Sequence, residues 1–388
     1  MNMEEWQTLE ANPHCMQSDH LVTGTPFTRI LSPDAPRKEY RRRTDDQKSV
    51  VHWGQRKLLM SEIEFLLMTQ TPKKNCTVVY AGAAPGTHVQ VLAEMFPSHT
   101  FILIDPAPFT VRPEKGRIVI HQCMFTDALA HKLRRSLHHT RVLFISDVRS
   151  CDSDLHSEQI HNERVKADMC SQSQWHSILQ PYKSMLKFRL PYTSGSTNYL
   201  KGDLYLPVWG PITTTECRLV VSTHPGERTY DHTEHEEKMF FFNTITRVAL
   251  YPHSVSGCGI DHCYDCAAEV QILGAYADSS NLSIAQLSDL ISSSISSERT
   301  LAHENPEYNQ KTSVIRKHQW PEGKPSYEKY FEVGVSALKK KRSRPSRKGK
   351  SAPPSINSDT CTSPGWPSRA RAPAESAQTS SRRARPAP

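Results

Sequence analysis

The 388-residue sequence lacks the features of membrane and secreted proteins. No apolar run approaches the eighteen residues that span a bilayer, and the N-terminal stretch lacks the basic-then-apolar pattern of a signal peptide. Only 37% of the residues are hydrophobic, and 27 prolines with many serines indicate that part of the chain does not fold. We therefore expect a soluble, unsecreted protein without a membrane partner, whose ten cysteines remain thiols.

The excess of positive charge is confined to the C-terminal tail. Residues 339–388 hold 13 Lys/Arg against Asp359 and Glu375, a net charge of +11, so the overall +8 leaves about −3 for the first 338 residues. The tail also lacks apolar periodicity, and we predict that it is disordered. Two roles stay open for it: weak binding of a polyanion, or a solubilising or localising function.

A glycine-containing turn after an apolar segment organises the rest of the chain. Thr77 to Tyr80 predict a buried strand, which breaks at Gly82-Ala-Ala-Pro-Gly86. A helical pattern follows at once, with one apolar face formed by Val89, Leu92, Ala93 and Phe96. Such a turn leaves free backbone N–H groups above a sheet, where nucleotide-like ligands bind. It is neither the G-x-G-x-x-G of nicotinamide enzymes nor a Walker loop.

A second apolar segment adds a carboxylate. Residues 101–105 predict a strand that ends in Asp105, about twenty residues past the glycines. A carboxylate there can accept hydrogen bonds from both ribose hydroxyls of an adenosine cofactor. The turn itself resembles motif I of S-adenosylmethionine-dependent methyltransferases, in the version found in RNA 2′-O-methyltransferases. A tight strand–helix turn in another α/β protein is the alternative.

The remaining patterns predict strands that alternate with helices. Strands are expected over 117–121, 141–147, 184–189 and 213–222, with a closing strand over 269–276. Helices are expected over 55–70, 125–133 and 236–248, with another opening at 175, while 151–172 are expected to be irregular. This alternation predicts an α/β fold with a mostly parallel central sheet and helices on both faces.

Four ionisable residues occupy interior or strand-end positions: Lys57, Asp147, Lys187 and Glu216. A ribose 2′-hydroxyl is a poor nucleophile, so a base must take its proton as it accepts a methyl group. Free lysine has a pKa of about 10.4, and a second lysine nearby or desolvation lowers that value. Each residue alone is more often a surface or salt-bridge group, but the set of four on this scaffold indicates a catalytic site.

Seven segments extend the resemblance to one family, the poxviral cap-specific mRNA (nucleoside-2′-O-)-methyltransferases, which are small subunits of viral poly(A) polymerases. They are residues 54–59, 78–88, 103–105, 145–150, 186–189, 216–219 and 236–243. The resemblance implies a Rossmann-like S-adenosylmethionine-dependent methyltransferase domain over 38–278. It would follow an N-terminal arm (1–37) and precede a loosely ordered extension (279–338) and the tail (339–388). It also implies that the four ionisable residues form a catalytic tetrad, with Lys187 as the base.

The resemblance further implies a cofactor site for S-adenosylmethionine. Its residues are Gln55, Tyr80, Gly82, Gly86, Asp105, Phe125 and Asp147, with Phe125 beside the adenine. The family has an arginine two residues after the motif II aspartate, where this chain has Ala107. One cofactor contact is therefore absent or supplied elsewhere.

Cap recognition in the family depends on a methylated guanine stacked between two aromatic rings, which its positive charge favours. The implied cap-binding residues are Tyr40, Arg189, Leu190, Pro191, Tyr192, Thr214, Thr215, Glu216 and Glu236. Ser194 replaces an aspartate of the family's pattern. Tyr40 stands among basic residues at the end of an arm that we expect to lie across the domain, and a solvated basic strand is its alternative role.

Cys258, Cys263 and Cys266 have metal-like spacing, with His253 and His262 close by. Three thiols and a histidine would suit tetrahedral Zn²⁺, but the family has no such cluster. We therefore expect no metal and keep zinc as the alternative. The His232-Thr-Glu-His235 segment lacks the spacing of a zinc hydrolase and is expected at the surface.

The expected reaction is methylation of the 2′-hydroxyl of the first transcribed nucleotide of capped viral mRNA. The resemblance also implies a heterodimer with the catalytic subunit of a viral poly(A) polymerase, and a location in the virion and host cytoplasm. Two alternatives stay open. The first is that the chain is a non-catalytic RNA-binding polymerase subunit. The second is that it is a 2′-O-methyltransferase for uncapped or internal RNA.

Overall fold

The computed structural model of the protein describes residues 26–40, 53–70, 75–150, 158–211, 214–249, 251–255, 260, 262–278 and 280–295. The expectations for the basic tail, for residues 1–25 and for 296–338 lie outside these described residues. Within them, no helix is long and apolar enough to cross a bilayer.

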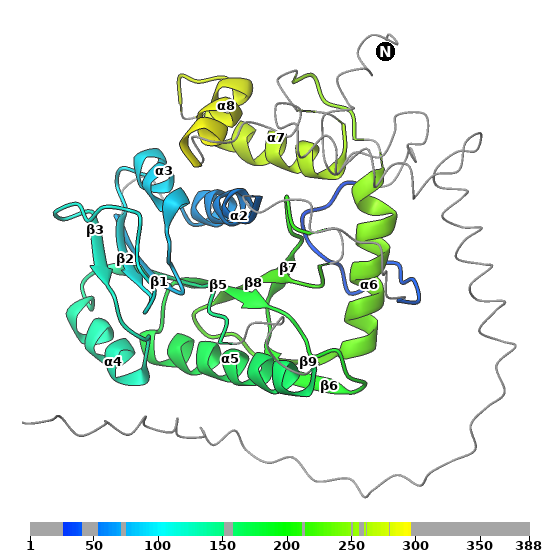
Figure 1. Cartoon of the computed structure of the whole chain (residues 1–388), viewed down its shortest axis with the longest axis horizontal. Coiled ribbons are helices and arrows are strands. Elements are labelled where there is room, and N and C mark those ends of the chain that lie inside the picture. Colours follow the sequence, from blue (N-terminus) through cyan, green and yellow to red (C-terminus); the bar gives the residue numbers. More distant parts are fainter. Residues whose placement is uncertain are drawn as a thin grey trace, which may run out of the picture. The chain divides into compact units, whose positions relative to one another are not determined.

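In the described part of the chain, nine strands form two sheets. They are β1 (Cys76–Ala81), β2 (Thr100–Ile104), β3 (Ile118–His121), β4 (Arg141–Ser146), β5 (Lys183–Phe188), β6 (Ser196–Leu200), β7 (Asp203–Tyr205), β8 (Cys217–Ser222) and β9 (Glu227–Asp231). The larger sheet has the order β3-β2-β1-β4-β5-β8-β7 (Figure 1). Strands β1 to β5 are mutually parallel, and β8 runs antiparallel to its neighbours β5 and β7. The smaller sheet is the antiparallel pair β6–β9.

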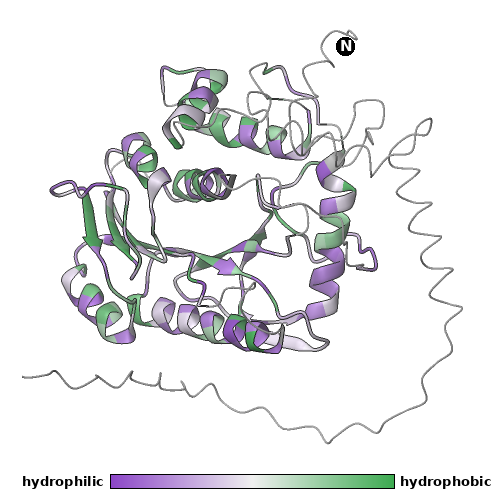
Figure 2. Cartoon of the chain, viewed as in Figure 1, coloured by the Kyte–Doolittle hydropathy of each residue, from purple (hydrophilic) through white to green (hydrophobic). Residues whose placement is uncertain are grey.

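Helices cover both faces of the larger sheet. They are α2 (Trp53–Thr69), α3 (Thr87–Met95), α4 (Asp127–Ser136), α5 (Glu158–Leu179), α6 (His232–Thr244), α7 (Tyr264–Ala277) and α8 (Ile284–Ile295), with a short 3₁₀ turn over Thr246–Val248. In Figure 1, α2 and α3 lie on one face beneath α7 and α8, and α4 and α5 lie on the other. Apolar residues dominate β2 and β3, whereas they alternate with polar residues in α4 and α5 (Figure 2).

The strand order creates a crevice for a ligand. From β1 the chain builds outward through β2 and β3, and then crosses back to β4 and β5 on the other side. In open parallel sheets, ligands bind at such a switch point, outside the carboxyl ends of the strands. The topology confirms the expected Rossmann-like methyltransferase fold with a mostly parallel sheet and helices on both faces.

The N-terminal segment extends the sheet at its β7 edge. The Leu31 N–H donates to the Leu204 carbonyl at 2.8 Å, and the Leu206 N–H donates to the Arg29 carbonyl at 2.8 Å. The buried Arg29 guanidinium then pairs with Glu64 of α2 at 2.9 Å and donates to the Tyr264 hydroxyl of α7. This segment therefore fastens α2, which carries part of the site, to the sheet edge and to α7.

Two expected elements are wrong. Residues 158–172 belong to α5 rather than to an irregular stretch, because its buried face carries His161, Asn162 and Gln172 and so lacks a clear apolar period. Residues 269–276 are helical in α7 rather than a strand. The buried Ala268, Ile272 and neighbouring positions follow the helical period, but periodicity alone does not assign so short an apolar run to a helix or a strand.

The expectation that the His232–His235 segment lies at the surface is also wrong. Both rings are buried at the start of α6, and His235 Nε2 lies 2.9 Å from the Thr215 carbonyl oxygen. Burial lowers the pKa of His235 to about 4. His235 is therefore a neutral core residue, and it ties α6 to the chain just before β8.

Candidate active site

The turn after β1 brings the backbone close to the end of β4. Gly82 has a φ of +79°, and a Cβ there would lie 2.8 Å from the carbonyl carbon of Asp147. Gly86 has a φ of +70° and caps α3 at its N-terminus. Positive φ and the close approach both require glycine at position 82. The turn and the end of β4 thus form the floor of the crevice at the switch point.

Asp105 is fixed at the rim of this crevice. Its Oδ2 accepts the Ala84 N–H at 3.3 Å, and its Oδ1 accepts the Ala107 N–H at 2.8 Å. The carboxylate therefore bridges the loops that follow β1 and β2. Each oxygen has a second lone pair that stays available for a ligand.

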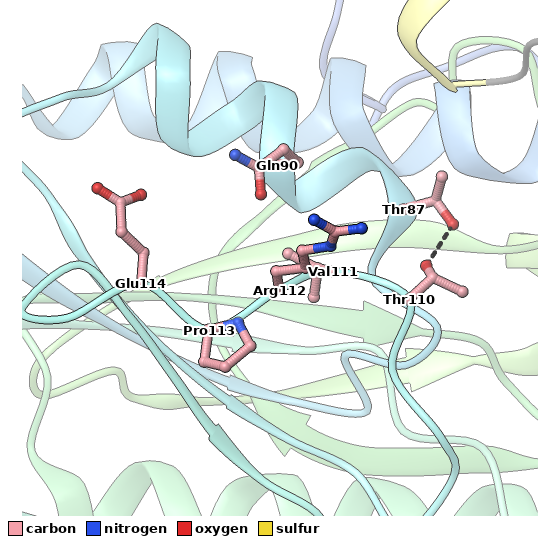
Figure 3. Close-up of a pocket in the computed structure, with 7 residues that line it drawn as sticks. All are labelled: Thr87, Gln90, Thr110, Val111, Arg112, Pro113 and Glu114. Atoms are coloured by element: carbon pink, nitrogen blue, oxygen red, sulfur yellow. Dashed lines mark hydrogen bonds between the residues drawn. The ribbon is translucent and has the colours of Figure 1, made fainter.

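A cavity of about 470 Å³ adjoins the turn on the α3 side (Figure 3). At one side of it the Thr87 and Thr110 hydroxyls hydrogen-bond at 3.0 Å, and the Thr110 N–H donates to the Pro85 carbonyl at 2.8 Å. Its lining residues are Thr87, Gln90, Thr110, Val111, Arg112, Pro113 and Glu114, none of which belongs to the predicted tetrad.

The structure brings Lys57, Asp147, Lys187 and Glu216 together from four separate elements. Lys57 Nζ, on α2, lies 2.8 Å from Glu216 Oε1. Lys187 Nζ, on β5, lies 2.9 Å from Asp147 Oδ1 and 3.6 Å from Glu216 Oε2. The two carboxylates therefore hold the two ammonium groups at the carboxyl ends of β4 and β5.

Two arginines that the sequence did not single out complete this cluster. Arg218 Nη1 lies 2.6 Å from Asp147 Oδ1, and its Nη2 lies 3.3 Å from Glu216 Oε1. Arg149 Nη2 lies 2.6 Å from Glu216 Oε2. Each arginine follows a predicted tetrad carboxylate by two residues. That spacing keeps side chains on one face of an extended segment, and could have identified them.

Charges in this cluster are unbalanced. Among the described side chains, four cations (Lys57, Arg149, Lys187 and Arg218) share two carboxylates. Burial lowers the pKa of Lys187, and Arg149 and Arg218 lower it further against the opposing pull of Asp147 and Glu216. Burial raises the pKa of Asp147, but Lys187 and Arg218 outweigh it and hold this pKa at about 2.

Glu216 follows the same pattern. Burial raises its pKa, and the surrounding lysines and arginines hold it well below its usual value. The carboxylates therefore stay ionised near neutral pH, while burial and the arginines favour the deprotonated form of Lys187. An amine so placed, with carboxylates to stabilise its protonated form, is suited to accept a proton from a hydroxyl.

A second buried network joins two predicted cofactor residues, Gln55 and Tyr80. The Tyr80 hydroxyl donates to Glu62 Oε1 at 2.7 Å, and His88 Nε2 lies 2.9 Å from the same oxygen. His88 Nδ1 lies 2.7 Å from Gln55 Oε1. Glu62 is fully buried, and its Oε2 makes no hydrogen bond with the described residues. The network fixes the Gln55 amide against the first turn of α3.

Several predicted cap-binding residues lie next to the ionic cluster. The Tyr192 ring is 40% exposed, and the Arg189 guanidinium lies 4.2 Å from its centroid. The Thr215 hydroxyl donates to the Tyr192 hydroxyl at 3.2 Å, and the Glu216 N–H donates to Thr214 Oγ1 at 3.0 Å. Leu190 and Pro191 are buried in the link between β5 and Tyr192.

The remaining predicted aromatics lie apart from that group. Tyr40 packs edge-on against Phe240 of α6 at 5.5 Å, on the helix that also carries Glu236. The role of Tyr40 as the second stacking ring stays a prediction. Phe125 is buried against Trp175 at 4.8 Å, and its contact with an adenine also stays a prediction.

The cysteine cluster falls partly outside the described residues, because Cys258 is not among them. Cys263 and Cys266 are buried at the start of α7. Within the described part of the chain, no three metal-binding side chains gather in a group that would hold an ion.

The fold and the site define a class of protein, an α/β methyltransferase-like protein with an ionic cluster at the carboxyl ends of its strands. The sequence model of the poly A polymerase regulatory subunit family matches residues 31–278, and the chain belongs to that family.

Several curated relatives carry the name cap-specific mRNA (nucleoside-2′-O-)-methyltransferase, among them the following two. One, from Myxoma virus (strain Lausanne), is 32% identical over 225 residues, which are 52% of this chain and 63% of the relative. The other, from Fowlpox virus (strain NVSL), is 31% identical over 213 residues, which are 50% of this chain and 68% of the relative. The chain thus spans 63% of the length of the Myxoma relative. The family resemblance inferred from the sequence is confirmed.

A solved structure of bluetongue virus VP4, described as an RNA-capping production line, overlaps 60% of this chain and 37% of its own. Its sequence identity is 11% and its TM-score is 0.35, a likeness that supports no argument.

Proposed function

We propose that the chain is a cap-specific mRNA 2′-O-methyltransferase that uses S-adenosylmethionine. The observation that carries the proposal is the ionic cluster around Lys187, a lysine with a lowered pKa between two ionised carboxylates. It lies at the end of β4, where the Gly82 turn makes its closest approach. The names of the curated relatives support the same activity.

The residues around the turn fit an adenosine cofactor. Gly82 lets the turn approach the end of β4 closely, and the Asp105 carboxylate is held at the rim with lone pairs for ribose hydroxyls. Gln55, Tyr80, Gly86 and Asp147 are proposed to complete the cofactor site, with Phe125 near the adenine. When bound, S-adenosylmethionine supplies an electrophilic methyl group.

Lys187 Nζ is proposed to take the proton of the ribose 2′-hydroxyl while the oxygen of that hydroxyl accepts the methyl group. Asp147 and Glu216 then stabilise the ammonium that forms, at the distances they already keep from Lys187. Arg218 and Lys57 help to hold both carboxylates ionised, and Arg149 acts on Glu216, so that neither carboxylate competes for this proton. Each residue of the proposed tetrad therefore has a separate part in one proton transfer.

The cap is proposed to bind beside this site. Tyr192, with Arg189 over its ring, presents an exposed aromatic surface next to Thr215 and Glu216. A positively charged methylated guanine stacks favourably on such a ring. Leu190, Pro191 and Thr214 support this surface. Tyr40 and Glu236 are proposed as the second ring and an edge contact from the α6 side.

The test of substrate class compares methyl transfer onto two RNAs of one sequence, one with a methylated cap and one with a 5′-triphosphate. The proposal expects transfer to the capped RNA and little to the other. Equal transfer to both would support the alternative, a 2′-O-methyltransferase for uncapped or internal RNA. Absence of transfer to either, by folded protein, would contradict the enzyme proposal.

The family description favours a second role, as a regulatory subunit of a viral poly(A) polymerase. We propose a heterodimer with the polymerase catalytic subunit, in the virion and host cytoplasm, in addition to the methyltransferase role. Its test is co-purification with that subunit and a tail-extension assay with Lys187→Ala. Unchanged stimulation of tail extension by this variant would separate the two roles, and failure to co-purify would contradict the role as a polymerase subunit.

The methyltransferase domain is proposed to cover residues 38–278.

A further inference from the structure

A basic surface lies at the opposite end of the sheet from the ionic cluster. It is formed by Lys132, Arg134 and Arg135 near the end of α4, Arg141 at the start of β4, and Tyr182 and Lys183 at the start of β5. We call these six residues the basic edge. Arg141 and Lys183 lie close together because β4 and β5 are parallel and pair from Leu143 and Lys183 onward. The end of α4 joins them through Arg134, which contacts Gln180 just before Tyr182.

The chain concentrates positive charge at this surface. Residues 128–146 contain four Lys/Arg, three histidines and no acidic residue, and residues 169–202 also contain no acidic residue. By contrast, the first 338 residues together carry a net charge of about −3. Stabilisation of the α4 dipole accounts for Arg134 and Arg135 in its last turn, but not for Arg141 or Lys183 on the strands.

The basic edge is held in a fixed arrangement. The Tyr182 N–H donates to the Val142 carbonyl at 2.8 Å, and its own carbonyl accepts the Thr223 hydroxyl at 3.2 Å. Arg134 Nη2 donates to Gln180 Oε1 at 3.1 Å, which ties the end of α4 to the turn before Tyr182. Cations and an aromatic ring are therefore displayed on anchored backbone.

The aromatic group is open to a ligand. Tyr182 is 44% exposed, and the Arg141 guanidinium lies 3.4 Å from the centroid of its ring. A tyrosine ring covered on one side by an arginine plane is the kind of platform on which unpaired bases stack. An acidic protein surface would be matched by the cations alone and would not need this ring.

The basic edge is too far from the ionic cluster to belong to it. Strand β4 begins at Arg141, and Asp147 follows its last residue. Six residues of strand at about 3.3 Å each separate the two by roughly 20 Å. A ligand of the basic edge is therefore either a separate molecule or a distant part of a long polyanion.

We propose that the basic edge binds single-stranded RNA, with phosphates on the exposed Lys132 and Arg135 and a base on the Tyr182–Arg141 pair. The inference rests on the proposed function, in which RNA is the substrate. It adds a second RNA contact outside the region that would hold the reacting nucleotide. Binding of this kind tolerates many sequences and depends strongly on salt.

The experiment measures binding of the full chain to a labelled single-stranded RNA with a 5′-hydroxyl, across a series of salt concentrations. Lys132→Gln with Arg135→Gln removes two exposed cations from the basic edge. The matched control, Lys166→Gln with Lys201→Gln, removes two exposed cations elsewhere. The basic tail is present in every variant, so its contribution cancels in the comparison.

In the Lys132→Gln, Arg135→Gln variant, the slope of log affinity against log salt concentration is expected to be smaller in magnitude by about 1.4. This is the change expected when two phosphate contacts to a single strand are lost. The control is expected to keep the wild-type slope. Tyr182→Ala is expected to weaken binding roughly tenfold through lost stacking, with a small change in slope. Thermal unfolding of each variant shows that the fold is retained.

The proposal would be overturned if the double variant and Tyr182→Ala both kept the wild-type slope and affinity. It would also be overturned if the control variant lost as much RNA affinity as the double variant. Unchanged RNA binding with loss of co-purification of the polymerase catalytic subunit would assign the basic edge to a protein partner instead. The assay contains no cofactor and no cap. Failure of the methyltransferase proposal would appear in transfer assays and leave this binding difference intact.

Discussion

Two adjacent residues of α2, Arg56 and Lys57, enter two different buried ion clusters. Lys57 joins the cluster at the carboxyl ends of β4 and β5 through Glu216. Arg56 instead turns toward α7 and α8, where it pairs with Glu269 and donates to the Ser292 hydroxyl at 2.9 Å. Both clusters are buried and both rest on the same helix, so burial alone does not distinguish their roles.

Charge balance separates the two clusters. Among the side chains that the structure describes, the Arg56 cluster has one cation and one carboxylate, and Ser288 and the Trp209 indole N–H also donate to Glu269. Burial raises the pKa of Glu269, but Arg56 and these donors lower it, so the carboxylate is stable and satisfied. The Lys187 cluster has a surplus of cations and a lysine whose pKa is lowered. We infer that imbalance marks a reacting site and balance marks a structural one.

The largest effect should come from removing the proposed base. Lys187→Ala is expected to lower the rate of methyl transfer to capped RNA by roughly 10²- to 10⁴-fold, which is the usual contribution of general base catalysis. The thermal unfolding temperature should fall little, since the variant removes one of several surplus cations. Rates from single-turnover assays measure the effect, and a wild-type rate would show that Lys187 is not the base.

The structural cluster should respond in the opposite way. Glu269→Gln leaves Arg56 as an uncompensated buried charge and is expected to lower the free energy of unfolding by about 3–5 kcal/mol. The pH dependence of methyl transfer should not change in the protein that remains folded. Denaturant unfolding and a pH–rate profile measure the two quantities.

Acid titration provides the control for that prediction. The folded-state pKa of Glu269 is lowered from its usual 4.5, so its stabilisation is present above pH 4.5 and is lost as pH falls through the folded-state value. Wild type should lose this part of its stability in acid, and Glu269→Gln should not. The same acid dependence in both proteins would contradict the structural role of the pair.

A moderate effect is expected from Arg218, which lowers the pKa of Lys187. Arg218→Gln removes that cation, so the pKa of Lys187 rises and methyl transfer should require a higher pH. The midpoint of the pH–rate profile should therefore move upward. Arg218→Lys keeps the charge and serves as the control, with a midpoint near that of wild type. An unmoved midpoint in Arg218→Gln would show that the surplus charge does not act on the base.

The smallest effect is expected at the network that orients Gln55. His88→Ala removes a contact of about 1 kcal/mol to the Gln55 amide, which corresponds to roughly a fivefold rise in KM for S-adenosylmethionine. The value of kcat at saturating cofactor should change little, because His88 contacts no tetrad residue. Steady-state kinetics at varied cofactor concentration test this, and a loss confined to kcat would contradict the positioning role.

The sequence alone located the elements whose apolar pattern is strong. The strand expected over 77–80 is β1 (Cys76–Ala81), and the helix expected over 55–70 is α2 (Trp53–Thr69). The pattern failed for α5, whose buried face is largely polar, and for α7, whose short apolar run fits a helix or a strand. Strands β6, β7 and β9 are short and polar, and no apolar periodicity in the sequence predicts them.

The site, too, could be predicted from the sequence only in part. Family resemblance named the four tetrad positions, and the structure brings them together, but their charge balance depends on Arg149 and Arg218. Both arginines were visible two residues after a carboxylate, yet only the fold shows that they turn into the same cluster. Likewise, nothing in the sequence separates Arg56 from Lys57, because the direction of each side chain depends on how α2 packs.

The most direct test of the account is a titration of Lys187 itself. Lysine side chains labelled with ¹³C give separate NMR signals, and Lys187→Arg identifies the signal that belongs to this residue. We expect Lys187 in the wild-type protein to titrate below its usual pKa of 10.5, and to titrate higher in Arg218→Gln. A Lys187 that titrates at or above 10.5 would contradict the claim that surplus charge and burial prepare it to act as the base.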